Sequence, residues 1–221
     1  MKYKVVEKFV SINGEGYLSG QLAIFIRFKG CNLDCSYCDT RWANEENATY
    51  ELMTKEDIYN YIKSTEVKNV TLTGGEPLIQ EGMMELLSFL CKDENISIEI
   101  ETNGSVDIER FTKIEKNRPK FTMDYKLSFS NMEDKMIGNN FKYLTKNDTV
   151  KFVVSSKDLE RTKYIIDKYN LINTTNVYIS PVFGEVDMND IVEFMKNNKM
   201  NGATLQIQLH KVIWDPNKKG V

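Results

Sequence analysis

The sequence contains a single histidine, only four prolines and no long hydrophobic run. One histidine, His210, excludes sites that need two, such as those of the HExxH zinc proteases. No stretch approaches the roughly 20 apolar residues of a membrane span, and Glu7 and Lys8 interrupt the N-terminal segment before it could serve as a signal peptide. We therefore predict a cytoplasmic protein without a membrane partner, in a compartment where thiols stay reduced.

An excess of charge of one sign is also missing. The 221 residues include 29 basic and 32 acidic side chains, for a net charge of −3 and a pI of about 5.4. Direct binding to nucleic acid is not expected, because it requires a basic surface. Hydrophobic residues make up 41% and charged residues 28%, which is typical of soluble globular proteins. The length favours one domain over residues 1–221.

Apolar runs alternate with helical patterns from about residue 20 onward. Strands are predicted at residues 22–28, 70–73, 96–100, 121–125, 150–154, 177–180 and 204–209. Helices are predicted from Thr54, with Asp57 as its capping-box partner, and at 82–91, 106–116, 159–169 and 188–197. This alternation indicates βαβ units and a parallel sheet. A closed eightfold barrel typically needs about 250 residues, so we predict an α/β fold with an incomplete, partial TIM-like parallel β/α barrel.

Two segments lie outside this alternation. Residues 1–20 precede the first βα unit, and Val5 to Gly20 is predicted to form a hairpin. Residues 131–148 lack a clear period and are predicted to be an excursion from the barrel. Functional residues of β/α barrels follow the C-terminal ends of the strands. The loops after the predicted strands are therefore where a site is expected.

Three of the four cysteines follow the first of these strands. Cys31, Cys35 and Cys38 have the spacing C-x3-C-x2-C. Thiolates are soft ligands that suit zinc, Cu(I) and iron–sulfur clusters. Structural zinc and most iron–sulfur clusters take four protein ligands, so either Cys91 or His210 completes the set or one metal corner stays open to an exogenous ligand. Cys91 lies on the apolar face of a predicted helix, where a buried thiol packs as a small hydrophobic side chain.

The cysteine spacing resembles the signature of radical S-adenosylmethionine (SAM) enzymes. Residues 73–77 (TGGEP), otherwise an ordinary turn, resemble the GGEP motif of that superfamily, and residues 101–104 (ETNG) resemble its next SAM-contacting segment. The resemblance implies that the three cysteines hold a [4Fe–4S] cluster whose fourth iron is chelated by SAM. It also implies that SAM is contacted by Tyr37, Asp39, Gly74, Gly75, Glu76, Glu101, Asn103, Lys126 and Ser128.

Shorter signatures resemble the 7-carboxy-7-deazaguanine synthase family: SINGEG at residues 11–16, DTR at 39–41 and QLHK at 208–211. This resemblance covers nearly the whole chain. It implies a carbon–nitrogen lyase of queuosine biosynthesis that converts 6-carboxy-5,6,7,8-tetrahydropterin into 7-carboxy-7-deazaguanine with loss of ammonia. It further implies a homodimer, a low-potential electron donor such as flavodoxin or ferredoxin, and Mg²⁺ on Thr40. Residues 1–20 become a substrate-binding extension, and the implied substrate contacts are Ile12, Asn13, Gly14, Glu15, Arg27, Thr73, His210 and Val221.

Other interpretations of these residues stay open on sequence alone. Arg27 could lie on a half-exposed strand, Asp39 and Thr40 could cap a turn, and His210 could be a core histidine of the last predicted strand. The chain also departs from many family members, which have glutamine in place of Asn13 and tryptophan in place of Tyr37. Two other functions compete: an activating enzyme for a glycyl-radical enzyme, and a non-catalytic zinc or iron–sulfur module. The SINGEG, DT and QLHK segments argue against the activating enzyme.

Overall fold

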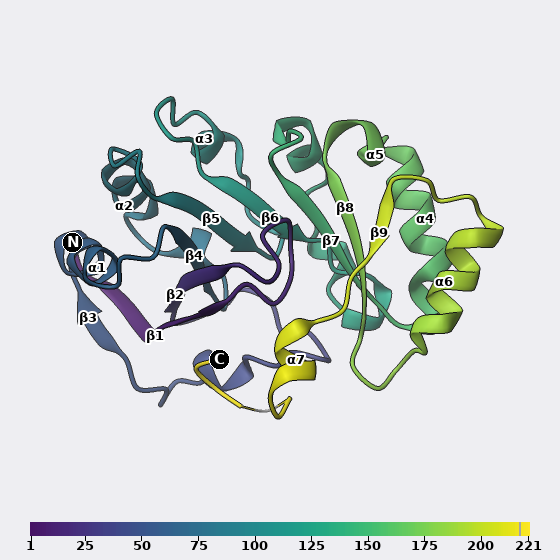
Figure 1. Ribbon diagram of the computed structural model, residues 1–221, viewed down its shortest axis with the longest axis horizontal. Coiled ribbons are helices and arrows are strands. Elements are labelled where there is room, and N and C mark those ends of the chain that lie inside the picture. Colours follow the sequence, from purple (N-terminus) through teal and green to yellow (C-terminus); the bar gives the residue numbers. More distant parts are fainter. Residues whose placement is uncertain (217) are drawn as a thin grey trace.

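The computed structural model describes residues 1–216 and 218–221. Its centre is a nine-stranded sheet in the order β3-β1-β2-β4-β5-β6-β7-β8-β9 (Figure 1). The strands from β2 to β9, apart from β3, run parallel, whereas β1 and β3 pair in antiparallel fashion at one edge. The sheet does not close, which confirms the predicted incomplete β/α barrel.

The strands are β1 (Tyr3–Ile12), β2 (Leu22–Phe28), β3 (Glu51–Met53), β4 (Asn69–Gly74), β5 (Ser97–Thr102), β6 (Lys120–Asp124), β7 (Thr149–Val154), β8 (Asn176–Pro181) and β9 (Ala203–Leu205). The helices are α1 (Lys55–Ser64), α2 (Met83–Leu90), α3 (Glu109–Thr112), α4 (Leu159–Lys168), α5 (Leu171–Thr174), α6 (Met188–Asn197) and α7 (Leu209–Ile213). Short 3-10 turns occupy parts of the loops, three of them between β6 and β7.

Helices α1 to α6 pack on the outer face of the curved sheet (Figure 1). Helix α1 begins after the predicted capping box, in which the Thr54 hydroxyl accepts from the Asp57 N–H and the Asp57 carboxylate accepts from the Thr54 N–H. Its Ile58 and Ile62 join one hydrophobic core with the outward side chains of the strands. Because strand side chains alternate in direction, residues between the apolar ones of each strand face the inside of the barrel.

The N-terminal region differs from the expected hairpin of Val5 to Gly20. β1 is ten residues long and pairs with β2, so the hairpin has its turn at residues 13–21 and extends into the first barrel strand. Strand β3, which the sequence did not indicate, covers the outer edge of β1. Its three residues are too few to produce a visible alternation.

The predicted helix at 106–116 is shortened to α3. The side-chain amide of Asn140 explains the late start of this helix, because it donates to the carbonyl groups of Gly104 and Val106 and accepts from the Ile108 N–H. These bonds hold the backbone of residues 104–108 outside a helix. Asn140 belongs to the stretch 131–148, which lies between β6 and β7 and contains two 3-10 turns.

The predicted last strand at 204–209 is wrong in its second half. β9 ends at Leu205 and α7 begins at Leu209. The Leu209 N–H donates to the Gly14 carbonyl at 3.0 Å instead of continuing the ladder along β8. His210 is therefore a residue of a short helix that packs on the loop at residues 13–16.

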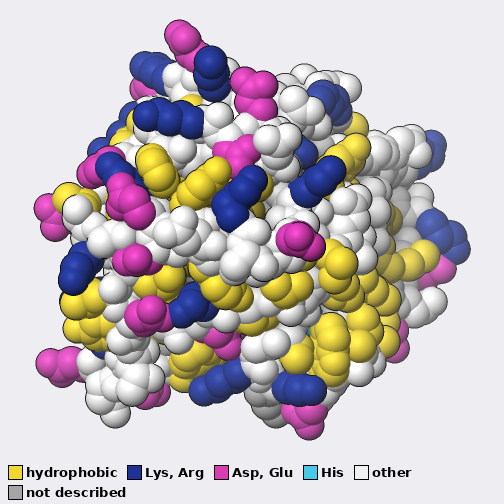
Figure 2. Space-filling model, turned by 60° about the vertical axis from the view of Figure 1, so that its left-hand side comes forward, with side chains coloured by type: hydrophobic (Ala, Val, Ile, Leu, Met, Phe, Trp, Pro, Cys, Tyr) yellow, Lys and Arg dark blue, Asp and Glu magenta, His cyan; other side chains and the backbone are white. Residues whose placement is uncertain are grey.

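The surface agrees with the balanced composition. On the face seen in Figure 2, basic and acidic side chains are interspersed and no region of one sign stands out. Within the part of the chain that the structure describes, no helix combines the length and the apolar character needed to cross a membrane.

Candidate active site

A cavity of about 640 Å³ opens at the C-terminal ends of the parallel strands, and we call it the central cavity. Neighbouring strands each contribute a polar side chain to its wall: Arg27 from β2, Thr73 from β4, Glu101 from β5, Asp124 from β6 and Lys151 from β7. The strand register places Arg27 beside Thr73 and Asp124 beside Lys151. The fold therefore gathers functional side chains where barrel enzymes have their active sites.

The three clustered cysteines all line the central cavity. Burial raises the pKa of the Cys31 thiol, and it raises the pKa of the Cys35 thiol to about 11. Cys91 is 1% exposed and packs in the hydrophobic core instead. Within residues 1–216 and 218–221, no group of three or more Cys, His, Asp or Glu side chains is placed to hold a metal ion by itself.

This donor set fits an iron–sulfur cluster that leaves one iron open. Three soft thiols face a shared cavity, and Cys91, one of the two candidates for a fourth ligand, is remote from it. The other candidate, His210, lines the cavity but stands over the loop at residues 13–16, where a Cβ on Gly14 would come within 2.3 Å of the His210 Nδ1. His210 is therefore packed against this loop.

Two glycines allow the loop after β4 to pack closely against the start of the cysteine loop. A Cβ on Gly74 would lie 2.4 Å from the Phe28 carbonyl oxygen, and a Cβ on Gly75 would lie 2.2 Å from the Gly30 carbonyl oxygen. Any side chain here would push the two loops apart. Both glycines line the central cavity, so backbone atoms form this part of its wall.

Glu76 is placed differently from the other residues of its motif. It is fully buried and accepts from the Leu78 N–H, the Thr102 hydroxyl and the Asn103 N–H, the last at 2.7 Å. Burial raises the pKa of Glu76 to about 7, although these three hydrogen bonds oppose the shift. The carboxylate ties the loop after β4 to the loop after β5 and is not part of the cavity wall.

Of the remaining residues expected near SAM, all but one line the central cavity. Asn103 lines the cavity, and its side-chain N–H donors reach the Asn32 oxygen at 3.1 Å and the Cys31 sulfur at 3.6 Å. Tyr37, Asp39 and Lys126 are also in the wall, as is Glu101. Ser128 is not, because its hydroxyl donates to Asp158 at 2.8 Å.

Most residues expected to bind substrate also line the central cavity. Those in the wall are Ile12, Gly14, Glu15, Arg27, Thr73, His210 and Val221. Asn13 is the exception. It is 2% exposed, and its side-chain oxygen accepts from the Thr71 hydroxyl beneath the wall.

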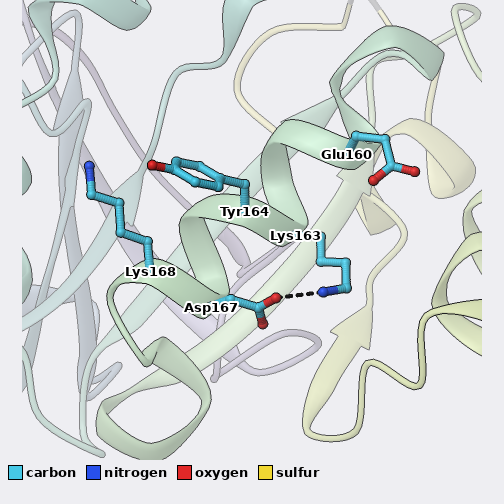
Figure 3. Close-up of a pocket in the computed structure, with 5 residues that line it drawn as sticks. All are labelled: Glu160, Lys163, Tyr164, Asp167 and Lys168. Atoms are coloured by element: carbon cyan, nitrogen blue, oxygen red, sulfur yellow. Dashed lines mark hydrogen bonds and ion pairs between the residues drawn. The ribbon is translucent and has the colours of Figure 1, made fainter.

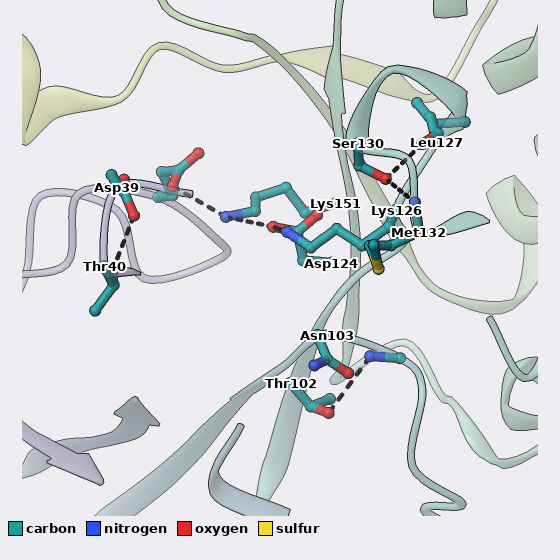
Figure 4. A network of polar contacts seen from close by, with 12 residues as sticks. Asp39, Thr40, Thr102, Asn103, Asp124, Lys126, Leu127, Ser130, Met132 and Lys151 are labelled. Atoms are coloured by element: carbon teal, nitrogen blue, oxygen red, sulfur yellow. Dashed lines mark hydrogen bonds and ion pairs between the residues drawn. The ribbon is translucent and has the colours of Figure 1, made fainter. Parts of the chain in front are cut away.

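Two lysines and two carboxylates in the cavity wall form a largely buried network. The Lys151 ammonium lies 3.0 Å from Glu15 Oε2 and 3.5 Å from Asp124 Oδ2, and the Lys126 ammonium lies 2.8 Å from the same Asp124 oxygen. Figure 4 shows both lysines pointing toward Asp124. Burial opposes ionisation of Glu15 and Asp124, but the lysines outweigh it and lower the pKa of each carboxyl.

Thr40 and Asp39 form a smaller polar pair at the mouth of the cavity. The Thr40 hydroxyl donates to Asp39 Oδ1 at 2.9 Å (Figure 4), and the Lys211 ammonium lies 3.7 Å from Asp39 Oδ2. The Asp39 side chain is 59% exposed, and Lys211 and the Thr40 hydroxyl lower its pKa. Both oxygens are ligands of the kind that Mg²⁺ takes.

Several wall residues were not among those expected to bind SAM, substrate or metal. Glu7 accepts from Arg27 Nε at 2.9 Å, Gln208 donates to Glu15 Oε2 at 3.2 Å, and Lys219 lies 4.0 Å from the centre of the Trp42 ring. Lys151 was also not expected at the site, although a lysine within the apolar strand TVKFVV can be recognised in the sequence. Such a residue is solvent-exposed in most sheets, but here it faces the inside of a barrel.

A second hollow runs along the outer side of α4 (Figure 3). Its lining comes from this helix alone: Glu160, Lys163, Tyr164, Asp167 and Lys168. Lys163 and Asp167 pair with each other at 2.5 Å, four residues apart. The hollow lacks thiols and close backbone loops, so we place the chemistry in the central cavity.

Comparison with known proteins gives three findings. A family model described as the radical SAM superfamily matches residues 25–197. The 7-carboxy-7-deazaguanine synthase of Clostridium acetobutylicum is 62% identical over 222 aligned residues, which cover 100% of both chains, and that of Leptospira interrogans is 34% identical over 97% of this chain and 96% of its own. The crystal structure of QueE from Escherichia coli matches the fold with a TM-score of 0.73 at 21% identity, over 94% of each chain.

Proposed function

We propose a function for this chain from one premise: it belongs to the radical SAM superfamily and, within it, to the 7-carboxy-7-deazaguanine synthase family. The chain converts 6-carboxy-5,6,7,8-tetrahydropterin into 7-carboxy-7-deazaguanine and releases ammonia, as a carbon–nitrogen lyase of the queuosine pathway. The observation that supports this most is the central cavity, in which the three thiols and the Glu15, Arg27 and His210 side chains share one space.

The cofactors supply the difficult chemistry. A [4Fe–4S] cluster with SAM, when bound, provides the radical that removes a hydrogen atom from the substrate. Cys31, Cys35 and Cys38 would hold the cluster. The backbone at Gly74 and Gly75, with Asn103 and Lys126, would bound the space for SAM, and Glu76 would support it from behind by joining two loops.

The protein residues orient the pterin. Arg27 would bind the substrate carboxylate, for which its guanidinium has four N–H donors besides the one that Glu7 accepts. Glu15 would accept from the donor edge of the pterin ring, because its Oε1 is buried without a hydrogen-bond partner. Thr73 would contact the substrate from β4, and Ile12, Gly14, His210 and Val221 would enclose it and exclude water. Asn13 would act from beneath, by fixing the loop through Thr71.

Further features of the family belong to the same proposal. We propose that Thr40, with Asp39 beside it, contributes to a Mg²⁺ site completed by water and substrate oxygens. We also propose one catalytic domain over residues 1–221, a homodimer in the cytoplasm, and a low-potential donor such as flavodoxin or ferredoxin.

The test is reconstitution of the protein under anaerobic conditions with iron, sulfide, SAM, reductant and the carboxytetrahydropterin. We expect 7-carboxy-7-deazaguanine and ammonia in equal amounts. SAM cleavage without a deazapurine product would instead favour an activating enzyme. Zinc without iron in the purified protein would favour a structural metal module.

Four single cysteine substitutions sharpen this test. Cys31→Ala, Cys35→Ala and Cys38→Ala should each lose the cluster and all SAM cleavage. Cys91→Ala is the matched control, because Cys91 lies in the hydrophobic core rather than in the cavity. It should keep its iron content and product formation. A loss of iron in this fourth variant would contradict the three-thiol assignment.

A further inference from the structure

We propose that Lys151 is a positioning residue for substrate recognition: by pairing with Glu15, it keeps that carboxylate a hydrogen-bond acceptor, and the cavity thereby selects rings that present a 2-amino group beside a ring N–H. The inference deepens the proposed function and rests on it, because it places a pterin against Glu15. It concerns a residue with no place in the motifs that identify the family.

The contacts around Glu15 are unequally shared between its two oxygens. Oε2 accepts from the Lys151 ammonium at 3.0 Å and from the Gln208 amide at 3.2 Å. Oε1 is buried and has no partner, although Glu15 lines the central cavity. The side chains of Glu15 and Lys151 are only 10% and 11% exposed. One oxygen is thus fixed by the protein, and the other is left for a ligand.

Removing Lys151 would affect Glu15 more than Asp124. Asp124 would keep the Lys126 ammonium at 2.8 Å, whereas Glu15 would keep only the neutral Gln208 amide. The other charged or titratable groups that act on Glu15 are Asp124 and His210; Asp124 repels its negative charge, and burial lowers the pKa of His210 and so favours its neutral form. A buried carboxyl without a cation takes up a proton. It then gains an O–H donor in place of an acceptor.

The charge state of Glu15 determines which hydrogen-bonding groups a bound ring must present to it. A pterin presents two N–H donors, on its 2-amino group and at N3, and an ionised Glu15 can accept from them. A lumazine has a carbonyl oxygen in place of the amino group, and that oxygen would face the carboxylate without a proton between them. Mispaired buried polar groups are strongly rejected. The Lys151–Glu15 pair therefore sets which ring is bound.

The experiment uses 6-carboxypterin and 6-carboxylumazine as fluorescent probes, titrated against the cluster-loaded protein with SAM. The wild-type protein should bind the pterin about tenfold to a hundredfold more tightly. Lys151→Met should reduce that ratio to near one, and Lys151→Arg should restore most of it. Lys163→Met, which removes the same charge from the outer face of α4, is the matched control and should leave the ratio unchanged.

The same measurement in a Glu15→Gln variant distinguishes a positioning role of Lys151 from a general structural role. In Glu15→Gln, adding Lys151→Met should have no further effect on the ratio, because Lys151 acts through Glu15. The neutral double variant also guards against misfolding of Lys151→Met alone. A wild-type protein that binds neither probe would overturn the proposed function. A wild-type preference that survives Lys151→Met, or an equal loss in both backgrounds, would overturn only the role of Lys151.

Discussion

Arg27 is oriented by a partner that a bulge in the neighbouring strand supplies. The register of β1 against β2 shifts by one residue between Val5 and Glu7. Because of this shift, Glu7 lies directly opposite Arg27 on the neighbouring strand. The Glu7 carboxylate accepts from Arg27 Nε at 2.9 Å, and the two side chains are 16% and 18% exposed. Bulges next to active sites commonly re-aim a side chain in this way.

We expect Glu7→Ala to raise the KM for the carboxytetrahydropterin about tenfold, which corresponds to one hydrogen bond to a charged group. The reason is that Arg27 loses the contact that fixes its guanidinium plane. SAM cleavage without substrate should be unchanged. Steady-state kinetics with Glu51→Ala as control, an acid on β3 that pairs with Lys8, would check this. An unchanged KM with a lower kcat would contradict it.

The sequence anticipates site residues where spacing reflects chemistry and misses them where only the fold brings partners together. The residues singled out by the cysteine spacing and the glycine pair all line the central cavity, and their roles there stay predictions. The expected direct contacts of Asn13, Glu76 and Ser128 are not supported by their placement, because the side chains bond to Thr71, Thr102 and Asp158 behind the wall. These three partners lie 26 to 58 positions away along the chain, so no local pattern indicates them.

At the scale of elements, β5 shows how alternation builds a polar interior. Ile98 and Ile100 face the helices, whereas Glu99 and Glu101 point inward. Glu99 is 6% exposed, and its carboxyl accepts from the Thr122 hydroxyl at 2.5 Å. Burial and repulsion from Glu101 raise the pKa of Glu99 to about 7, against the effect of that hydrogen bond.

This shift predicts a pH dependence of stability. In the folded state Glu99 holds its proton up to about pH 7, whereas in the unfolded state it loses the proton near its ordinary pKa of 4.5. The folded protein binds more protons in this window, so the free energy of unfolding should fall as the pH rises from 5 to 8, by up to about 3 kcal/mol. Glu99→Gln should remove its share of the slope and leave the share of Glu76, whose pKa burial also raises to about 7. Urea unfolding across the range measures it, and an unaltered slope would contradict the assignment.

Helices and strands were predicted well where nearby residues determine their ends, and poorly where a residue distant in the sequence does. α6 was predicted with the observed bounds and α4 to within one residue, because their apolar stripes and caps are local. The helix at 106–116 and the strand at 204–209 were overestimated. In both cases a distant group, Asn140 or the Gly14 carbonyl, takes the hydrogen bonds that would have continued the element.

At the scale of the whole molecule, the cavity is closed by segments from both ends of the chain. The C-terminal residues from Lys218 to Val221 line it, and Lys219 lies over the Trp42 ring just after the cysteine loop. Figure 1 shows α7 and the C-terminus beside the segment that follows β2. The tail thus covers the mouth of the barrel near the cluster ligands.

Removing residues 214–221 should weaken pterin binding about tenfold or more and speed SAM cleavage in the absence of substrate, because water gains access to the cavity. The free energy of unfolding should change by only about 1 kcal/mol, since most of the residues in this range that the structure describes are exposed. Trp42→Ala should act in the same direction. Tyr50→Ala, which removes a similar ring under Lys29 outside the cavity, should not. Wild-type affinity in the truncated chain would disprove the covering role.

The ties between the two ends have a consequence for how the chain folds. The parallel strands follow one another in sequence order across the sheet, so the scaffold can grow by adding one neighbour at a time. The Gln206 side chain instead forms hydrogen bonds with both the N–H and the carbonyl of Gly16, 190 positions away in the sequence. Contacts between residues so far apart carry the largest entropic cost of loop closure. On gentle warming, ligand affinity should vanish while the circular dichroism of the scaffold persists, and the Gly16 amide should exchange its hydrogen sooner than those of β4 and β5.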